Sequence, residues 1–377
     1  MNLVDIEGTT NLAGNFPVLT TTVGVDSALL LDVVLDSVLV VREKYFPDDS
    51  GIVTIDLVNI LSELQELEVP DSETDIFHQV KGYGVLGLFV SDGVEEPITY
   101  YSVLIRGGVS KAPVNTSTFL QQNFLTWQPQ IKKVKQNDQE WLTYYATTPA
   151  TVKVKAYFTG SAPVVGNLVD LPGGELSSFN VSYGTIDSLF PAPPTSPVFY
   201  DIWVEDTEGD RMSNIQRYGL TKEYFEYEDV FLFENSIGGI DTIRFTGESI
   251  KRNEFTISRA VFDKVTKDYK IRKLTVFKKN TGVFRSEEER DWSVEFFTSL
   301  RKFLQVGSNF VQIYADEIKL ESTRYKINNG DFEYAVCLDD QYYSVERETA
   351  ELAAPHIFPV ELPEEPIFTE QFTNQYQ

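Results

Sequence analysis

Short runs of apolar residues alternate with turn-forming residues along most of this chain of 377 residues. Between Phe16 and about Ser110, the apolar runs are residues 18–25, 29–45, 52–61, 85–90 and 98–105. Runs of this length, separated by turn residues, are typical of an antiparallel β-sandwich. We therefore expect an N-terminal β-rich domain over residues 1–118.

Two segments of this domain require a choice between helix and strand. Residues 26–41 are mostly apolar, which fits either one buried helix or two strands that meet at Asp36-Ser37. The many valines favour two strands, because β-branched side chains suit a pleated surface. Residues 55–67 instead predict a helix that stops before Pro70. Its apolar residues recur every three to four positions: Leu57, Ile60, Leu61, Leu64 and Leu67.

A second domain is expected over residues 119–220. Its predicted strands are residues 141–146, 152–158, 176–181 and 198–204, with turn residues between them. This spacing is typical of an immunoglobulin-like or fibronectin-like β-sandwich. The sequence Asp206-Thr207-Glu208-Gly209-Asp210 is expected to close a hairpin between the last of these strands and residues 212–218.

The third domain, over residues 221–344, is predicted to contain two hairpins. Gly238-Gly239 lies between residues 231–235 and 240–245, two segments that each contain large apolar residues. Glycine accepts the positive φ values of a tight turn, so this pair predicts the first hairpin. Tyr325 and Ile327 alternate toward Asn329-Gly330, which predicts the second.

One amphipathic helix is predicted in the third domain, over about residues 286–304. Ser286 is a suitable N-cap, and Glu289, three residues later, completes a capping box. The large apolar residues that follow share one helical face: Trp292, Phe296, Leu300 and Phe303. We expect Arg301 and Lys302 in the last turn. The predicted fold class is therefore mainly β: two or three β-sandwich-like domains in series, the last with this helix, followed by an extended arm.

The C-terminal arm, residues 345–377, differs in composition from the rest of the chain. It has seven Glu, one Arg and four Pro, and proline excludes a long helix or a central strand. The arm nevertheless contains apolar residues that are candidates for docking a partner: Ile357, Phe358, Val360, Leu362, Ile367, Phe368 and Phe372. Docking on a neighbouring subunit and packing against the arm's own domain would both satisfy them.

The net charge limits the choice of partners. The 57 acidic and 32 basic residues give a formal charge of −25, which repels phosphate, so we expect no nucleic-acid partner. The strongest basic run, six Lys and one Arg between Lys264 and Lys279, alternates with apolar residues and is interpreted as the solvated face of strands. No stretch reaches the ~18 apolar residues of a membrane span. The N-terminus resembles no leader peptide, so we expect synthesis in the cytoplasm.

Patterns of catalytic or metal-binding residues are sparse. His78 and His356 are the only histidines, so a catalytic triad or a multi-histidine zinc site is not expected. Asp206, Glu208 and Asp210 fit either a calcium-binding loop or a charged hairpin tip. We therefore predict no catalytic residue, no cofactor and no metal site. Two tryptophans, Trp127 and Trp141, would stack on sugars if exposed, or belong to a core if buried.

Several motifs resemble those of structural proteins encoded by Bacteroidetes phages and prophages. The motifs are Phe124-Leu125-Thr126-Trp127-Gln128-Pro129, Glu140-Trp141-Leu142, residues 230–242, Asn280-Thr281-Gly282 with Glu289, Trp292 and Phe296, and Phe332-Glu333-Tyr334. They cover about residues 119–343. The resemblance implies a virion protein of the tail tip or baseplate, and it brings no catalytic residues.

Three functional hypotheses follow. In the first, the chain is a structural tail protein in the virion that forms a homo-oligomer and docks other virion proteins. In the second, it is a carbohydrate-binding or adhesive β-sandwich protein, such as a receptor-binding protein, that contacts glycans through surface aromatics such as Trp127. In the third, it is a hydrolase built on paired acids. The resemblance favours the first.

Overall fold

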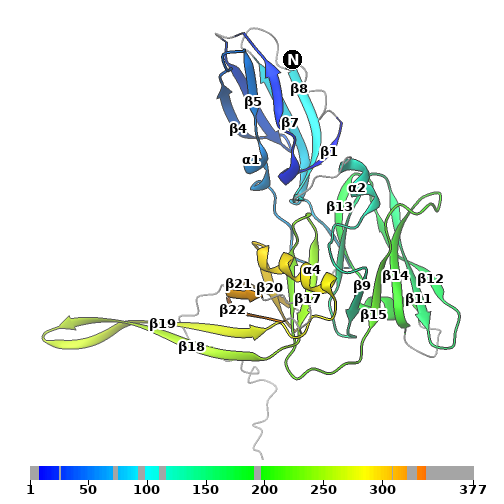
Figure 1. The fold of residues 1–377 in the computed structure, drawn as a ribbon, viewed down its shortest axis with the longest axis vertical. Coiled ribbons are helices and arrows are strands. Elements are labelled where there is room, and N and C mark those ends of the chain that lie inside the picture. The colour runs from blue at the N-terminus through cyan, green and yellow to red at the C-terminus, as the bar shows by residue number, and fades with distance from the viewer. Residues whose placement is uncertain are drawn as a thin grey trace, which may run out of the picture. The chain divides into compact units, whose positions relative to one another are not determined.

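The computed structural model describes residues 8–24, 27–70, 75–91, 98–109, 116–190, 197–307, 309–320 and 329–336. The chain is mainly β, with several sheets and few helices, as predicted (Figure 1). It forms two compact units: Met1–Glu254 with Leu274–Leu338, and Phe255–Lys273 with Asp339–Gln377. Among the described residues, no helix is long and apolar enough to cross a membrane.

Strands that lie between Thr10 and Ile105 form the first two sheets. The larger sheet has the order β1-β8-β7-β3-β4, and its strands are β1 (Thr10–Leu12), β8 (Ile98–Ile105), β7 (Tyr83–Ser91), β3 (Leu29–Leu35) and β4 (Val38–Tyr45). The smaller pairs β2 (Leu19–Thr22) with β5 (Ile52–Ile55), and the 3-10 helix η2 (Ala13–Asn15) precedes β2. Both sheets contribute to one buried apolar core.

The segment with many valines forms two strands, as predicted. Asp36 and Ser37 link β3 to β4 with positive φ values of 47° and 69°, the conformation of a two-residue hairpin turn. The helix predicted over residues 55–67 is wrong in its extent, because α1 spans only Val58–Ser62. Leu57 and Leu61 pack in the first core, whereas Leu67 packs in a different core. The chain therefore leaves the helix between Leu61 and Leu67.

The second pair of sheets encloses a core of aromatic and branched side chains. One sheet has the order β12-β11-β14-β15-β9, with strands β12 (Val164–Leu171), β11 (Ala150–Phe158), β14 (Pro197–Asp206), β15 (Gln216–Leu220) and β9 (Ile131–Val134). The other contains β10 (Trp141–Ala146), β13 (Glu175–Asn180) and β6 (Ile76–His78), and the helices are α2 (Thr116–Gln122) and α3 (Tyr183–Leu189). All four strands predicted in this region are present.

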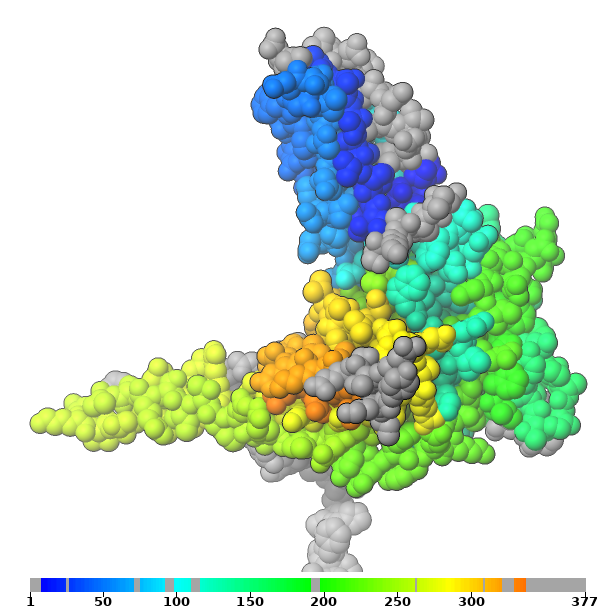
Figure 2. Space-filling view, viewed as in Figure 1, coloured from blue at the N-terminus to red at the C-terminus, as the bar shows by residue number. Residues whose placement is uncertain are grey.

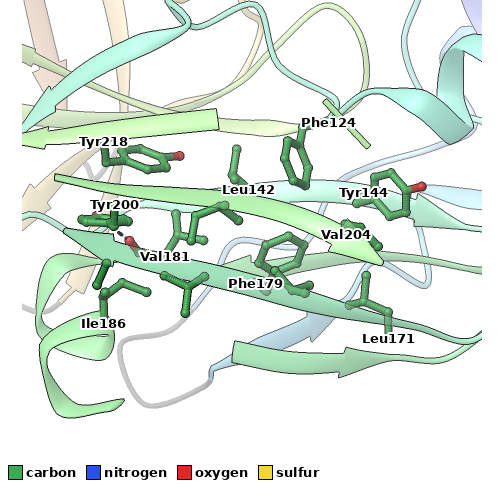
Figure 3. Close-up of a cluster of buried hydrophobic side chains, with 14 of the residues drawn as sticks. Phe124, Leu142, Tyr144, Leu171, Phe179, Val181, Ile186, Tyr200, Val204 and Tyr218 are labelled. Carbon is green, nitrogen blue, oxygen red and sulfur yellow. Dashed lines mark hydrogen bonds between the residues drawn. The ribbon is translucent and has the colours of Figure 1, made fainter. Parts of the chain in front are cut away.

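Figure 3 shows this core between the sheets, with Leu142 and Phe179 from one sheet and Tyr200 and Tyr218 from the other. The rings of Tyr200 and Tyr218 stack at a centroid distance of 5.2 Å. The Tyr200 hydroxyl donates to the Val181 carbonyl oxygen at 2.8 Å. A buried tyrosine hydroxyl needs such a partner, and here the bond joins the two sheets.

A seven-stranded sheet forms the third part, in the order β17-β16-β20-β21-β22-β19-β18. Its strands are β17 (Ile240–Phe245), β16 (Asp229–Glu234), β20 (Lys302–Val306), β21 (Asn309–Leu320), β22 (Gly330–Val336), β19 (Val265–Asn280) and β18 (Ser249–Phe262). The helix α4 (Glu287–Thr298) packs on β16, where Phe296 lies 5.2 Å from Phe231 and Trp292 lies 6.1 Å from Phe233 between ring centroids.

The predicted helix of residues 286–304 begins correctly but is wrong at its end. The Ser286 hydroxyl accepts from the Glu289 N–H at 3.0 Å, as in a capping box. The helix then stops at Thr298. Phe303 lies opposite Leu232 in the sheet, so its apolar character belongs to β20, and Arg301 and Lys302 are not in a last helical turn. Leu300 is 84% exposed between the two elements.

The second predicted turn, at Asn329-Gly330, is also wrong. β21 and β22 do pair as an antiparallel hairpin, but Gly330 is the first residue of β22 and pairs with Leu320 of β21, so it is a strand residue and not part of the turn. A Cβ atom at Gly330 would approach Leu320 Cδ2 to 2.2 Å, which explains glycine at this position. Tyr325 and Ile327 lie outside the described residues.

The Gly238-Gly239 pair belongs to a five-residue loop, residues 235–239, between β16 and β17. The Asn235 side-chain oxygen accepts from the Gly239 N–H at 2.8 Å, and Gly238 has φ of 91°. A Cβ atom on Gly238 would lie 1.9 Å from the Arg106 carbonyl oxygen, and one on Gly239 would lie 1.9 Å from that of Leu125. Glycine is therefore required mainly for close packing against two distant segments.

Gly239→Ala tests this packing without a change of φ region. The added methyl group would force the Leu125 backbone away, so we expect a loss of about 2 kcal/mol or more in the free energy of unfolding, measured by urea denaturation. Gly219→Ala is the matched control, because a Cβ atom added at Gly219 would have nothing within 4 Å. Equal stability of the two variants would contradict the close-packing role.

Candidate functional site

The strongest candidate site is the junction where the three groups of sheets meet. A single buried apolar cluster draws side chains from all three: Leu12, Leu67, Ile105, Leu120, Leu125, Trp141, Tyr145, Leu176, Leu232, Ile237, Ile240 and Phe303. Ile237 belongs to the loop of residues 235–239, so this loop inserts directly into the shared cluster. An interface of this apolar kind opposes the relative motion that is the default between domains.

Two arginines from different sheet groups surround one buried carboxylate at the junction. Glu234, at the end of β16, lies 2.7 Å from a guanidinium nitrogen of Arg106 and 2.5 Å from one of Arg301. Arg301 also donates to the Leu67 carbonyl oxygen at 2.7 Å. Burial raises the pKa of Glu234 above its ordinary value, although both arginines act to lower it. Removing one arginine would leave a buried charge only partly compensated.

A buried ion pair joins the second sheet group to β17. Lys132 Nζ donates to Glu140 Oε2 at 2.5 Å and to the Thr242 carbonyl oxygen at 2.5 Å. The Thr242 hydroxyl donates to the same Glu140 oxygen at 2.8 Å. Burial raises the pKa of Glu140, and Lys132 opposes this effect. Lys132 Nζ also lies 5.1 Å from the ring centroid of Trp292, a favourable cation–π distance, so α4 is tied to the same group.

Asp241, the second residue of β17, is fully buried. Its carboxylate accepts from the Thr126 hydroxyl at 2.6 Å and from Trp292 Nε1 at 3.1 Å. Burial raises its pKa to about 6, although these donors and Lys132 lower it. The Asn235 amide meanwhile donates to the Leu125 carbonyl oxygen at 2.8 Å. Residues 125 and 126 are therefore bonded to both the loop and β17.

A cleft of about 850 Å³ opens beside these contacts. Its walls come from β9, β17, the segment after β19 and the start of α4, and its apolar lining includes Ile131, Phe225, Val283 and Phe284. Four acids also line it, and each is engaged by the protein itself. Glu140 pairs with Lys132, Asp138 with Arg244, and Glu223 with Arg285.

The fourth acid of the cleft, Glu289, accepts from the Arg285 N–H at 2.8 Å. A glycoside hydrolase requires two carboxyl groups that face a substrate across a set gap. Two of the carboxylates in this cleft instead join separate segments of its wall, Asp138 with Arg244 and Glu223 with Arg285, and so contribute to the cohesion of the fold. The cleft could hold a ligand by its apolar lining, and each of its four acids contacts a basic side chain or an N–H group of the protein.

His78 lies beside Ser177 and Glu175. A serine, a histidine and an acid are the residue types of a catalytic triad, but their geometry here differs from that of a triad. Glu175 Oε2 lies 3.0 Å from His78 Nδ1, and the Ser177 hydroxyl lies 3.4 Å from the same nitrogen. A relay requires the acid and the serine on opposite ring nitrogens. This histidine therefore joins β6 to β13, and His356 lies outside the described residues.

Three other candidates from the sequence lie within the described residues: the loop at Asp206, Trp127 and Trp141. Asp206 accepts from the N–H groups of Glu208 and Asp210, both at 2.9 Å, as the tip of a hairpin does. Where the structure describes the chain, it contains no cluster of three potential metal ligands. Trp141 is buried, whereas Trp127 is 43% exposed and donates to the Ser236 hydroxyl at 3.2 Å.

All proposed docking residues of the arm lie outside the described part of the chain: Ile357, Phe358, Val360, Leu362, Ile367, Phe368 and Phe372. The sequence interpretation missed the junction residues Arg106, Glu234, Asp241 and Arg301. Asp241 gave no usable signal of its own, because β17 also contains Thr242 and Arg244. Its partners, more than 50 residues away on either side, had no local signal.

The raised pKa of Asp241 predicts that the protein becomes less stable as pH rises from about 4 to about 6. Its pKa rises from an ordinary 3.8 to about 6 on folding, so the folded state binds the proton more tightly in this window. The stabilisation is full below pH 4 and is lost above pH 6, on the order of 3 kcal/mol in total.

Comparison of the wild type with Asp241→Asn isolates this effect, because the other titrating groups cancel. The free energy of unfolding of the variant minus that of the wild type should increase from pH 4 to pH 7, as urea denaturation at each pH would measure. A difference that stays constant over this range would contradict the raised pKa.

Comparisons with known proteins assign no family to this chain. No family model matches it, and no curated protein matches it. Extracellular domains 3–5 of Drosophila OTK are 9% identical, with a TM-score of 0.19, over 81% of this chain and 92% of that one. The Bacteroides ovatus mixed-linkage glucan protein SGBP-B, solved with a heptasaccharide, is 8% identical, with a TM-score of 0.14, over 88% of this chain and 95% of that one. Similarity this low carries no argument about fold or function.

Proposed function

We propose that this chain is a structural protein of a tailed bacteriophage or phage-like particle, in the tail tip, the baseplate or the adjoining tail. It acts there by self-association and by docking neighbouring proteins. In this role the chain is made in the cytoplasm of a bacterial host and resides in the virion. A tail component must keep its binding surfaces at fixed positions while it is loaded, which requires rigid contacts between its domains.

One observation carries the proposal. Four of the five motifs that resemble the phage family, spread over about 170 residues of sequence, meet at the junction. Thr126 and Trp292 both donate to Asp241, and Thr242 donates to Glu140. The resemblance therefore rests on residues that fix one sheet group against another, and not on a set of residues around a reacting group.

The polar groups of the junction support the same role. Lys132, Glu140 and Glu234 are buried with their partners. Separating the partners of such a pair would leave an uncompensated buried charge, so the pairs disfavour other arrangements of the sheet groups. A protein that must present several β-domains in one arrangement benefits from that specificity, whereas a flexible series of binding modules does not require it.

A glycan-binding role is the second candidate, and Trp127 favours it. Its ring is 43% exposed and lies 6.3 Å from the ring of Phe119, so an aromatic surface is available for sugar stacking. Its indole N–H, however, already donates to Ser236. Binding on a glycan array that disappears in Trp127→Ala would support this role, and silence of the wild type would count against it.

The structural role predicts both association and location. The purified full-length chain should form a defined homo-oligomer in light-scattering chromatography, and should bind at least one other protein of the particle. An antibody against the chain should label one end of the tail in electron micrographs. A chain that stays monomeric, binds no particle protein and is missing from purified particles would contradict the proposal.

A further inference from the structure

The outer part of the β18–β19 hairpin, residues 255–273, forms a two-stranded ribbon, and no further strand of the described residues pairs with its edges. β18 is the last strand of its sheet. β22 pairs with β19 only from Val276 to Asn280, so residues 265–273 of β19 have β18 as their strand neighbour in the described structure. An isolated two-stranded ribbon is marginal in water, and an open edge is a template for another strand.

The ribbon exposes large apolar side chains on both strands. Phe255, Ile257 and Val261 occupy alternate positions of β18 and are 61%, 42% and 68% exposed. On β19, Tyr269 and Ile271 are 66% and 52% exposed. Figure 2 shows this segment in yellow-green at the surface. The sequence predicted a solvated charged face here, and in the structure the apolar residues are exposed as well.

The charge of the ribbon is opposite to that of the whole chain. Residues 255–273 contain six basic side chains (Arg259, Lys264, Lys267, Lys270, Arg272 and Lys273) and two acids, Asp263 and Asp268. Arg259 is paired with Asp268 across the ribbon at 2.9 Å. The net charge is therefore +4, in a chain of −25. A complementary partner would be acidic, apolar and able to form a strand.

The C-terminal arm of the chain has this chemistry. Its seven Glu and one Arg give residues 345–377 a charge of −6. Within it, Phe358, Val360 and Leu362 occupy alternate positions and would share one face of a strand. Pro355, Pro359 and Pro363 all have the other parity.

This proline pattern fits an edge strand. In a strand, successive N–H groups point to opposite edges, so the missing donors at 355, 359 and 363 would all lie on one edge. The other edge would keep every donor between residues 356 and 362. Such a segment can pair on one side only, which suits addition to the end of a sheet.

We propose that residues 356–362 of a second copy of this chain add as a strand to an open edge of the ribbon. Phe358, Val360 and Leu362 would cover the exposed apolar face, and the glutamates of the arm would meet the cations of the ribbon. The inference rests on the proposed function, in which copies associate. A head-to-tail exchange of this kind joins copies into a ring or a longer array.

The test uses full-length variants in sedimentation velocity. The ribbon variant is Phe255→Asp with Ile257→Asp, and the arm variant is Phe358→Asp with Val360→Asp. Each should weaken self-association by about tenfold or more, with an unchanged melting temperature for the rest of the fold. Val165→Asp is the control, because Val165 is 55% exposed on β12, and it should leave association unchanged.

A mixture of the two variants decides which copy supplies the strand. The arm variant keeps an intact ribbon and the ribbon variant keeps an intact arm, so the mixture should form a heterodimer and nothing larger. Hydrogen exchange of residues 255–262 should slow in that complex. Unchanged association of both variants would overturn the inference while leaving the tail role intact. Slow exchange in a monomer, lost in the arm variant, would also overturn it, because the arm would then bind its own chain.

Discussion

The close approach of the loop of residues 235–239 to two other backbone segments is the constraint on which the junction depends. Without side chains at Gly238 and Gly239, the loop reaches the carbonyl groups of Arg106 and Leu125. That approach brings Ile237 into the shared apolar cluster and places Asp241 within reach of Thr126. The buried polar contacts are then possible because the backbones are already held together.

This arrangement gives the buried charges a common role. Lys132, Glu140, Glu234 and Asp241 each carry a desolvation cost that only their partners offset. The partners come from different sheet groups, so separation of the groups would expose or unpair several of them at once. The contacts therefore favour one arrangement of the three sheet groups over alternatives that bury a similar apolar area.

Local patterns predicted the strands well and the helix limits poorly. The runs at residues 98–105 and 141–146, set between turn residues, predicted strands with the same bounds as β8 and β10, because short runs of this kind are typical of strands. Phe303 fitted a helical spacing by coincidence, and only its partner Leu232 shows that it belongs to a sheet. The glycine pair indicated a turn, but its contact with Leu125 depends on tertiary structure. For the same reason, the pairs at the junction could not be predicted: Thr126 and Asp241 are 115 residues apart.

The central claim is that the junction makes the three sheet groups one cooperative unit, and differential scanning calorimetry tests it most directly. We predict one unfolding transition for residues 8–336, with a calorimetric enthalpy equal to the van't Hoff enthalpy. Two or three separate transitions, each with the enthalpy of one sheet group, would contradict the account.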